Sequence, residues 1–528
     1  MPEYKTPGVY IEEVDRGPKT IEGVSTSVAG FLGVTERGPL GPHLVTSFAD
    51  YRRLYGGYSY DDDWTKHGKN EESLPYAVEG FFTNGGGRAY VTRVVPKSWV
   101  DNTFVAEKSL GDGGGTNALK AKAIGPGFWG NGLVVDVADA SSNGKDSQDN
   151  KRFKFRIGYW QNANSFGASD YDSIKKEKNK GNPDQEEVYD ELSPVVSDPN
   201  YYRTTINEAS SLVAIEELNE GVRPANTSSV ESLDMPSTSR DDATTSDDYT
   251  WKNYSGRGGL ATFEEVDEIT MVCVPDADVH SVDGQVVTHC VNRKDRIAIL
   301  ATDNTPSGGD GLSSDIISDY AALYYPYLDV REPGTGLERS IPPTGHVAGI
   351  YARSDAEHGV HKAPANEQVR GIDGVAKTVT KGEQASLNPI GINCIREFQG
   401  RGIRVWGART TSSDPSWKYV NVRRLFMYIE ESIEEGTNWV VFENNTEELW
   451  ARVRQTISDF LTTVWEDGGL MGSTPDEAFY VKCDRTTMTQ NDIDNGRLIC
   501  EIGIAPVKPA EFVVFRISQW TAGAEGGG

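Results

Sequence analysis

The chain has 528 residues, of which 37% are hydrophobic, and a formal net charge of −27. This length has room for about two to four domains, and the apolar content is sufficient for packed cores. A surface of this sign repels nucleic acid and anionic membranes, so general binding to either is excluded. No apolar run reaches the roughly 18 residues of a membrane-spanning helix, and we expect no direct membrane insertion.

The N-terminus and the cysteines indicate where the protein folds. The first residues, MPEYKTPGVYIEEV, lack a basic stretch followed by an apolar one, so we expect no signal peptide. The cysteines are an odd number, lie far apart and show no CxxC spacing: Cys273, Cys290, Cys394, Cys483 and Cys500. We interpret them as reduced, mostly buried thiols of a protein that folds and assembles in the cytoplasm.

The first strand-like segment has no partner nearby in the sequence. Pro7–Val14 reads PGVYIEEV, a short alternating strand after a polar start. A single strand cannot satisfy its own backbone groups. It must therefore add to another sheet, either in its own subunit or in a neighbouring one.

Strands and helices alternate in two parts of the chain, which indicates an α/β layer. The first part has predicted strands at Ser25–Thr35 and Arg88–Val95, and predicted helices from Ser47 to Gly56 and at Leu74–Asn84. After Gly256 the predicted strands are Glu268–Val274, Arg296–Ala301 and His346–Ala352, and the predicted helices are Val282–Arg293 and Ser314–Tyr325. We expect a doubly wound α/β core.

The stretch between these two parts predicts an inserted β-rich domain. Strand-like runs occur in Ala118–Val137, Phe153–Trp160 and Glu187–Val196, without clear helices between them. Pro224–Ser255 follows as a Ser/Thr/Asp/Asn-rich tract, which predicts a long mobile loop. Acidic residues far outnumber basic ones between Val196 and Trp251, so we expect this region to face solvent.

The C-terminal part predicts two helices and two strands. Apolar residues recur at helical spacing at Val422, Leu425, Phe426, Ile429 and Ile433. The run Asn445–Glu448 resembles a capping box that opens a second helix, and Asp467 with two glycines ends that helix. Leu498–Ala505 and Ala510–Trp520 are strand-like.

A glycine-rich cluster lies just before these helices. Gly391–Ile395 and Gly402–Trp406 predict two strands joined by a tight turn. The run Trp406–Arg409 then places a large aromatic beside glycine, alanine and arginine, which suits close backbone approach. Its arginine is either paired in a core or part of an interface, and by itself the cluster favours the core.

A subtilisin-like hydrolase is the main enzymatic alternative. Asp303 follows an apolar strand, where such an enzyme carries its acid. The later histidines are His346, His358 and His361, and the serines considered are Ser386 and Ser412. Neither serine has the glycines of a nucleophile turn. Adjacent His289 and Cys290 diverge on a helix, and Asp61–Asp63 lacks the glycine and distal glutamate of a calcium loop. We therefore predict no catalytic, cofactor-binding or metal site.

Motifs throughout the chain resemble the contractile tail sheath proteins of phage tails, pyocin-like particles and extracellular contractile injection systems. They are Pro7–Val14, Val28–Gly33, Arg37–Pro39, Phe81–Gly86, Phe128–Asn131, Tyr325–Leu328, Pro342–Gly349 with Ala352–Arg353, Lys362–Asn366, Gly391–Asn393, and Arg401–Gly402 with Trp406–Thr410. Each motif is weak alone, but their shared order is specific. Tyr327 stands where the family often has Trp, and Thr344 where Ser is common.

The resemblance implies a subtilisin-like but non-enzymatic core and a structural function. Subunits of this family form a homo-oligomer of stacked, usually hexameric rings around an inner tube protein, with baseplate and terminal cap proteins at the ends. The sheath contracts from a metastable extended state and drives the tube through a target envelope. The resemblance implies no cofactor and no nucleic-acid partner. It does not distinguish a phage virion tail from a bacteriocin or an injection system.

The resemblance also implies that extended N- and C-terminal arms add strands to adjacent subunits. The arm residues would be Val9, Tyr10, Ile11, Val14, Phe512, Val514, Phe515 and Ile517. For Glu511–Trp520, a buried strand of the subunit's own core is the alternative. Tube-facing candidates on the two C-terminal helices are Arg423, Arg424, Arg452 and Arg454, with ordinary solvated or paired arginines as the alternative.

The expected domains are the N-terminal arm (1–24), the first α/β part of the core (25–110), the inserted β-rich outer domain with its acidic loop (111–255), the subtilisin-like α/β core (256–390), the C-terminal α/β sheath domain (391–509), and the C-terminal arm with the glycine tail (510–528). A non-contractile adhesive protein would also fit the acidic insert, but it would require an export signal. The acidic region is expected on the outside of the particle, since burying its charge between rings would be costly.

Overall fold

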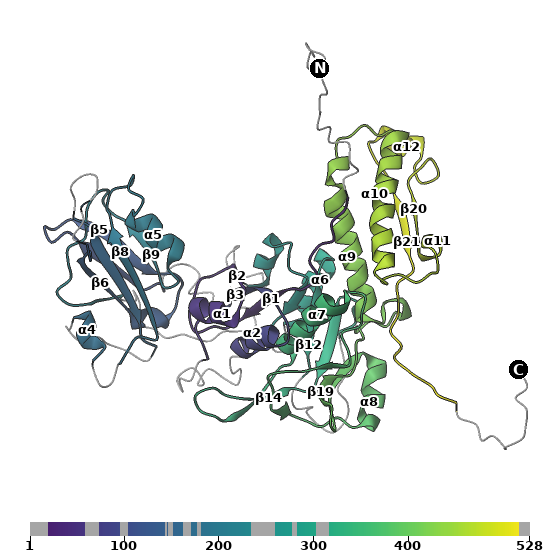
Figure 1. The fold of residues 1–528 in the computed structure, drawn as a ribbon, viewed down its shortest axis with the longest axis horizontal. Helices are drawn as coiled ribbons and strands as arrows, with labels where there is room; N and C mark the ends of the chain where they lie inside the picture. Colours follow the sequence, from purple (N-terminus) through teal and green to yellow (C-terminus); the bar gives the residue numbers. More distant parts are fainter. Residues whose placement is uncertain are drawn as a thin grey trace, which may run out of the picture. The chain divides into compact units, whose positions relative to one another are not determined.

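The structure is a computed structural model that describes residues 20–58, 73–95, 104–142, 145, 151–161, 170–176, 181–233, 259–276, 282–302 and 316–516 (Figure 1). The chain divides into two compact units. The main unit comprises residues 25–357 and 364–420, and the C-terminal unit comprises residues 1–24, 358–363 and 421–528.

A mixed sheet forms the centre of the main unit. Its strands among the described residues follow the order β16-β19-β18-β13-β12-β11-β1-β3-β2. Neighbours pair in parallel from β3 (Arg88–Arg93) through β1 (Val28–Gly33), β11 (Met271–Cys273), β12 (Ile297–Ala301) and β13 (Ala321–Tyr325) to β18 (Ile392–Phe398). Pairing is antiparallel at both ends of the sheet, where β2 (Pro42–Val45) pairs with β3, and β19 (Gly402–Val405) pairs with β18 and with the edge strand β16 (Glu367–Gln368). The mixed α/β class predicted from the sequence is confirmed.

The central strands carry small and branched apolar residues on both faces. Every residue of β1 and β12 is buried, as is typical of parallel strands that are covered on both sides. The helices of this unit are α1 (Phe48–Tyr55), α2 (Leu74–Thr83), α6 (Asp283–Arg293), α7 (Thr344–His358) and α8 (Lys381–Leu387). A small sheet of β15 (Glu338–Ile341), β14 (Leu328–Arg331) and β17 (Gly374–Val375) accompanies them.

Two predicted elements of this core are wrong. Ser314–Tyr325 was predicted as a helix, but its described part ends in strand β13, whose sequence AALYY is buried throughout. A short, wholly apolar run fits a buried strand as well as a helix. His346–Ala352 was predicted as a strand but lies in α7, where residues 344–354 are all buried. A helix without a polar face gives no helical period in the sequence.

The starts of α1 and α2 are held by polar side chains. Ser47 caps α1, as predicted, by accepting a hydrogen bond from the backbone amide of Asp50. The carboxylate of Asp276, which follows β11, accepts hydrogen bonds from the backbone amides of Ser73, before α2, and of Val34, after β1. Asp276 therefore joins the ends of two strands to the start of a helix.

Helices α2 and α7 touch backbone to backbone. An added Cβ at Gly345 would lie 2.0 Å from the carbonyl oxygen of Ala77, and one at Gly349 would lie 2.3 Å from that of Phe81. On α2, a Cβ at Gly80 would overlap the imidazole of His346, 2.3 Å from Nδ1. Since these three glycines lie at the contact, any larger residue would force the helices apart.

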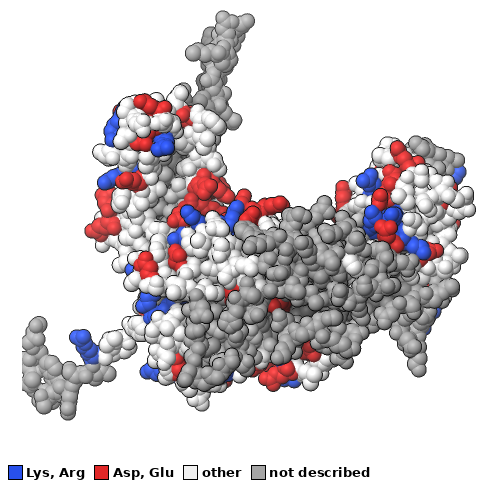
Figure 2. Space-filling view, turned by 180° about the vertical axis from the view of Figure 1, so that it is seen from behind, with Lys and Arg blue, Asp and Glu red and all other residues white. Residues whose placement is uncertain are grey.

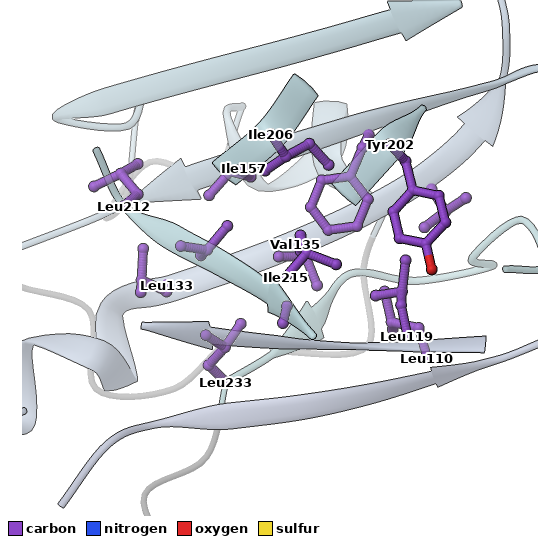
Figure 3. Packing of buried hydrophobic residues seen from close by; sticks show 14 of the residues in the cluster. Leu110, Leu119, Leu133, Val135, Ile157, Tyr202, Ile206, Leu212, Ile215 and Leu233 are labelled. Carbon is purple, nitrogen blue, oxygen red and sulfur yellow. The ribbon is translucent and has the colours of Figure 1, made fainter. Parts of the chain in front are cut away.

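The segment between β3 and β11 forms two antiparallel sheets. One sheet contains β4 (Glu107–Gly111), β5 (Asn117–Ala123) and β9 (Val213–Glu217). The other contains β10 (Glu231–Ser232), β6 (Leu133–Asp139), β7 (Phe153–Tyr159) and β8 (Gln185–Leu192), with helices α4 (Tyr171–Ile174) and α5 (Tyr202–Ala209) nearby in the chain. Both sheets and α5 contribute to one apolar core, which includes Leu119, Val135, Ile157, Tyr202 and Ile215 (Figure 3).

A buried polar network joins this inserted segment to the central sheet. Nη1 of Arg37 lies 3.1 Å from Oε1 of Glu36, and both side chains are at most 7% exposed. The hydroxyl of Tyr159 donates to the same Glu36 oxygen at 2.6 Å, and Nη2 of Arg37 donates to Oε1 of Gln185 at 2.5 Å. The Arg37 guanidinium also lies 4.7 Å from the centre of the Tyr159 ring.

The C-terminal unit contains long helices and a small sheet. Its elements are most of α9 (Val420–Thr437), then α10 (Glu447–Glu466), α11 (Pro475–Ala478), β20 (Phe479–Lys482), α12 (Gln490–Asp494) and β21 (Glu501–Ile504). Helices α9 and α10 pack through Leu425, Ile429 and the apolar stripe of α10, with β20 and β21 beside α10 (Figure 1). Thr446 caps α10 by accepting from the amide of Leu449, so the predicted box built on Asn445 and Glu448 is replaced by a single cap.

Candidate assembly interface

The predicted C-terminal arm is an exposed apolar segment where the structure describes it. Residues 510–516 form no strand, and Phe512, Val514 and Phe515 are 72%, 78% and 84% exposed. The alternative of a buried strand is therefore wrong for this part. Ile517 lies outside the described residues, as do the N-terminal arm candidates Val9, Tyr10, Ile11 and Val14.

Two of the four predicted tube-facing arginines are buried. Arg423 and Arg424 are 4% and 3% exposed, and Nη2 of Arg423 lies 3.0 Å from Oε2 of Glu430. Residues 420–425 are all buried, so the first turns of α9 are enclosed on every side. A buried guanidinium cannot be part of a surface. The prediction that these two arginines face a tube is wrong.

The other two arginines lie on α10 and have structural contacts of their own. The guanidinium of Arg452, which is exposed, lies 4.5 Å from the centre of the Trp439 ring. Nη1 of the half-buried Arg454 donates to the backbone carbonyl of Cys483 at 2.7 Å. Arg452 thus remains a candidate for a tube-facing surface. Arg454 instead holds the backbone at Cys483, the first residue after β20.

The sheet formed by β20 and β21 was not predicted as a site. Antiparallel pairing runs from Phe479 opposite Ile504 to Lys482 opposite Glu501. Two strands alone are marginal in water, and each outer edge presents backbone groups to which another strand can add. The sequence signal for β20 is only four residues long, FYVK, and its partner lies about twenty residues away, so pairing could not be predicted from it.

Apolar side chains are exposed around this sheet. They are Met471, Tyr480, Ile499 and Ile502, which are 58%, 54%, 37% and 36% exposed. The Tyr480 ring lies over Gly503, where an added Cβ would come within 2.2 Å of the ring. Among the described residues β20 and β21 form a sheet only with each other, and they carry exposed apolar side chains, a combination suited to a protein partner.

The described residues give no support for a catalytic site. His346 is 2% exposed within α7, and burial lowers its pKa to about 4. Asp303 lies outside the described residues. A cavity of about 10 Å³ at the carboxyl ends of β11 and β12 has room for about one water molecule, far less than a substrate requires. Among the described residues, no group of three His, Cys, Asp or Glu side chains could hold a metal ion.

The Trp406–Arg409 cluster is a packing feature. The guanidinium of Arg409 donates to the carbonyl of Asn388 at 2.8 Å, and its backbone amide donates to Oδ1 of Asn393 at 2.7 Å. Arg409 is 8% exposed. At Gly407 an added Cβ would lie 2.8 Å from the same Asn393 oxygen. Of the two interpretations drawn from the sequence, the core anchor is the one that these contacts support.

The charged side chains of the described residues form no large basic patch on the face shown in Figure 2. On the face shown in Figure 2, the acidic and basic side chains of the described residues are intermixed. None of the helices among the described residues is long and apolar enough to cross a membrane.

Two domains of phage tail sheath proteins match the chain in sequence. Residues 243–411 match the phage tail sheath protein central domain, and residues 412–519 match the phage tail sheath C-terminal domain. Together the matches cover more than half of the chain.

Individual proteins that are similar in sequence are also named tail sheath proteins. A prophage major tail sheath protein of Pseudomonas aeruginosa (strain UCBPP-PA14) is 25% identical over 254 residues, which is 46% of this chain and 64% of that protein. The tail sheath protein of Enterobacteria phage T4 is 25% identical over 215 residues, 40% of this chain and 32% of the phage protein. The matched regions thus span less than two thirds of these curated relatives.

Solved structures match over nearly the whole chain. The sheath of an extracellular contractile injection system, PVC, in its contracted state has a TM-score of 0.56 at 22% identity, and the match covers 98% of this chain and 99% of that one. A sheath tail protein from Desulfitobacterium hafniense has a TM-score of 0.53 at 12% identity, over 90% and 93% of the two chains. At these identities the structures show a shared fold. With the sequence matches, they show that the chain belongs to the contractile phage tail sheath family.

Proposed function

We propose that this protein is the structural subunit of a contractile sheath. The subunits polymerise as stacked rings around an inner tube and contract from a metastable extended state, which drives the tube through a target envelope. The observation that carries this proposal is the exposed apolar run from Phe512 to Phe515 in a member of this family. An isolated subunit gains nothing from exposing such a run, whereas a polymer buries it between subunits.

Strand addition would make the joints of the polymer. In this proposal the arm residues predicted from the sequence, Val9–Val14 and Phe512–Ile517, add to sheet edges of neighbouring subunits. The β20–β21 sheet is the acceptor that we favour, because it has two strands and exposed apolar side chains. Main-chain hydrogen bonds across such a joint keep subunits connected while their bodies rotate.

The finer features of the assembly are part of the same proposal. The rings are hexameric, and the further partners are the inner tube, a baseplate and a terminal cap. The subunit assembles in the cytoplasm and acts without catalysis, since contraction uses energy stored during assembly. The proposal also includes the division into two arms, a core in two parts, an inserted domain and a C-terminal domain that was predicted from the sequence.

We also propose the doubly wound, subtilisin-like topology for the core. Its support is the reversal of strand order at β1, where β3 lies on one side and β11 on the other. The proposal concerns topology alone, because similarity of fold does not transfer catalytic chemistry. A hydrolase function is not proposed, since no feature described above favours it.

Polymerisation can be tested with one substitution in the arm and one matched control. Val514→Asp places a charge on a residue that is 78% exposed, and Leu337→Asp does the same at a residue that is 67% exposed, beyond β14. Both variants are expected to fold. Only Val514→Asp should lose tubes in negative-stain electron microscopy, because a buried unpaired charge destabilises the joint.

Truncation tests the other arm. Deletion of residues 1–14 is expected to leave a folded, soluble subunit that cannot polymerise, with circular dichroism as the check on folding. Tubes of normal length formed by the truncated chain would contradict the role of the N-terminal arm.

A further inference from the structure

Two cysteines that are 17 positions apart in the sequence face each other in the C-terminal unit. The last pair in the β20–β21 ladder is Lys482 opposite Glu501. The same register places Cys483 opposite Cys500, at the end of the two strands. Both are free thiols here. We propose that this pair is an oxidation site, at which a small-molecule disulfide converts the two thiols into an intramolecular disulfide.

The hydrogen-bond pattern shows which kind of cross-strand pair they form. The backbone amide of Ala505 donates to the carbonyl of Ala478 at 2.8 Å, which marks these opposed residues as a hydrogen-bonded pair. Hydrogen-bonded and non-hydrogen-bonded pairs alternate along an antiparallel ladder. Five positions further along, Cys483 and Cys500 therefore form a non-hydrogen-bonded pair.

This kind of pair has the separation that a disulfide requires. Its Cα atoms are about 4.5 Å apart, within the range of about 4.4–6.8 Å found for disulfides. The carbonyl of Cys483 supports the assignment, because it accepts a hydrogen bond from Arg454 at 2.7 Å and so points away from β21. Both side chains also belong to the same apolar cluster, so they lie on the same side of the two strands.

The two thiols differ in exposure, which sets the order of reaction. Both belong to the apolar cluster beneath α10, where Cys483 is buried and Cys500 is half-buried. Cys500 is therefore the first to meet a reagent from solvent. By contrast, Cys273, Cys290 and Cys394 are all buried, and they are expected to react more slowly.

The reaction balances with an organic disulfide, RSSR, such as oxidised glutathione. The Cys500 thiolate attacks one sulfur of RSSR, forms a mixed disulfide and releases RS⁻, which takes up the proton lost by Cys500. The Cys483 sulfur then attacks the Cys500 sulfur, its proton leaves, and a second RSH is released. The two protein thiols lose two electrons and two protons in total, and RSSR gains them.

Slow reaction in the folded subunit follows from burial. Burial raises the pKa of Cys500 to about 12, and it also raises the pKa of Cys483. Few thiolates are therefore present at neutral pH, and a reducing compartment keeps the pair open. Once formed, the bond closes the segment that contains α12 and fixes the end of the β20–β21 sheet, which restricts the unfolded chain.

The test uses the full-length chain, purified with its thiols reduced and then incubated with oxidised glutathione. Peptide mapping under non-reducing conditions should recover a cross-linked peptide that joins Cys483 to Cys500, and the intact mass should fall by two hydrogens. The midpoint of thermal unfolding should rise by about 2–4 °C and return after reduction.

Variants separate the two chemical steps. Cys500→Ser should prevent the cross-link and leave Cys483 unmodified, whereas Cys483→Ala should stop at a stable glutathione adduct on Cys500. Cys290→Ser, the control, should still form the cross-link. If the folded wild-type chain yields no cross-linked peptide, or yields one between other cysteines, the proposal is overturned. Because mapping of the wild type decides this point, unfolding of a variant cannot obscure it.

Discussion

Asp276 shows how a single buried carboxyl can make stability depend on pH. Its side chain is fully enclosed and accepts backbone hydrogen bonds from Ser73 and Val34, yet burial outweighs these bonds and raises its pKa to about 6. Between about pH 4 and 6 the folded chain therefore holds a proton that the unfolded chain has lost. The free energy of unfolding falls as pH rises through this window.

We expect Asp276→Asn to remove this dependence. Since Asn cannot accept from both amides, the variant should be less stable than the wild type at pH 4 by about 1–3 kcal/mol. From pH 4 to 6 the wild type alone should lose up to about 3 kcal/mol from this group, so the difference between the proteins shrinks. Urea denaturation at pH 4, 5, 6 and 7 measures it. A difference that stays constant with pH would show that Asp276 does not titrate there.

The arginines show why single residues on the candidate surface were hard to place. Charged residues are usually exposed, so Arg423 and Arg424 were natural surface candidates. Their burial depends on what encloses the first turns of α9, which the spacing of apolar residues does not reveal. Phe512 and Phe515, by contrast, lie in a strand-like run at the end of the chain, and the structure leaves both side chains exposed.

At the scale of elements, the contact between α2 and α7 depends on glycine. We expect Gly345→Ala to destabilise the main unit by about 1–3 kcal/mol, because the new methyl group would lie 2.0 Å from a backbone oxygen of α2. Backbone atoms cannot move aside as a side chain can. Denaturant titration of the purified subunit measures the loss.

Gly284→Ala is the matched control, since Gly284 lies in α6 and an added Cβ there would meet nothing within 4 Å. This substitution should leave stability unchanged or raise it by up to about 1 kcal/mol through better helix propensity. Equal losses in both variants would indicate a general cost of alanine and would contradict a specific helix contact.

Elements with local signals were predictable from the sequence. The Ser47 cap, the helix at Leu74–Asn84 and the strand at Arg296–Ala301 depend on neighbouring residues, and the structure confirms them. The failures at β13 and α7 have one cause: β13 and residues 344–354 of α7 are buried throughout, so they lack the exposed polar face whose period distinguishes a strand from a helix. The register of the β20–β21 pair could not be predicted either, and therefore the facing positions of Cys483 and Cys500 could not be predicted from the sequence.

On the scale of the whole molecule, the inserted segment has the features of an independent domain. Its two sheets enclose their own core, in which the side chains of Leu133, Phe155, Ile206 and Leu212 are completely buried. We expect residues 104–233, expressed alone, to fold cooperatively. Far-ultraviolet circular dichroism should show β structure, and thermal unfolding should give one sigmoidal transition.

The joint to the central sheet provides the control for that experiment. Tyr159→Phe removes the hydroxyl that donates to Glu36, but Glu36 is absent from the isolated segment. The substitution should therefore lower the stability of the full chain and leave that of residues 104–233 nearly unchanged. An isolated segment without a cooperative transition would show that the segment requires the sheet in order to fold.

The place of the insertion has a consequence for how such a chain can change over time. The segment leaves after β3 and returns before β11, the two strands that flank β1, so the parallel sheet keeps its order whatever lies between them. Substitutions on the inserted sheets can accumulate without altering how the central strands pair. The contacts that join the segment to the sheet, those of Glu36 and Arg37 and the hydrogen bond from Arg93 to the carbonyl of Pro126, must be kept or replaced together. Selection can thus vary one region of the protein's surface while the framework that carries it stays the same.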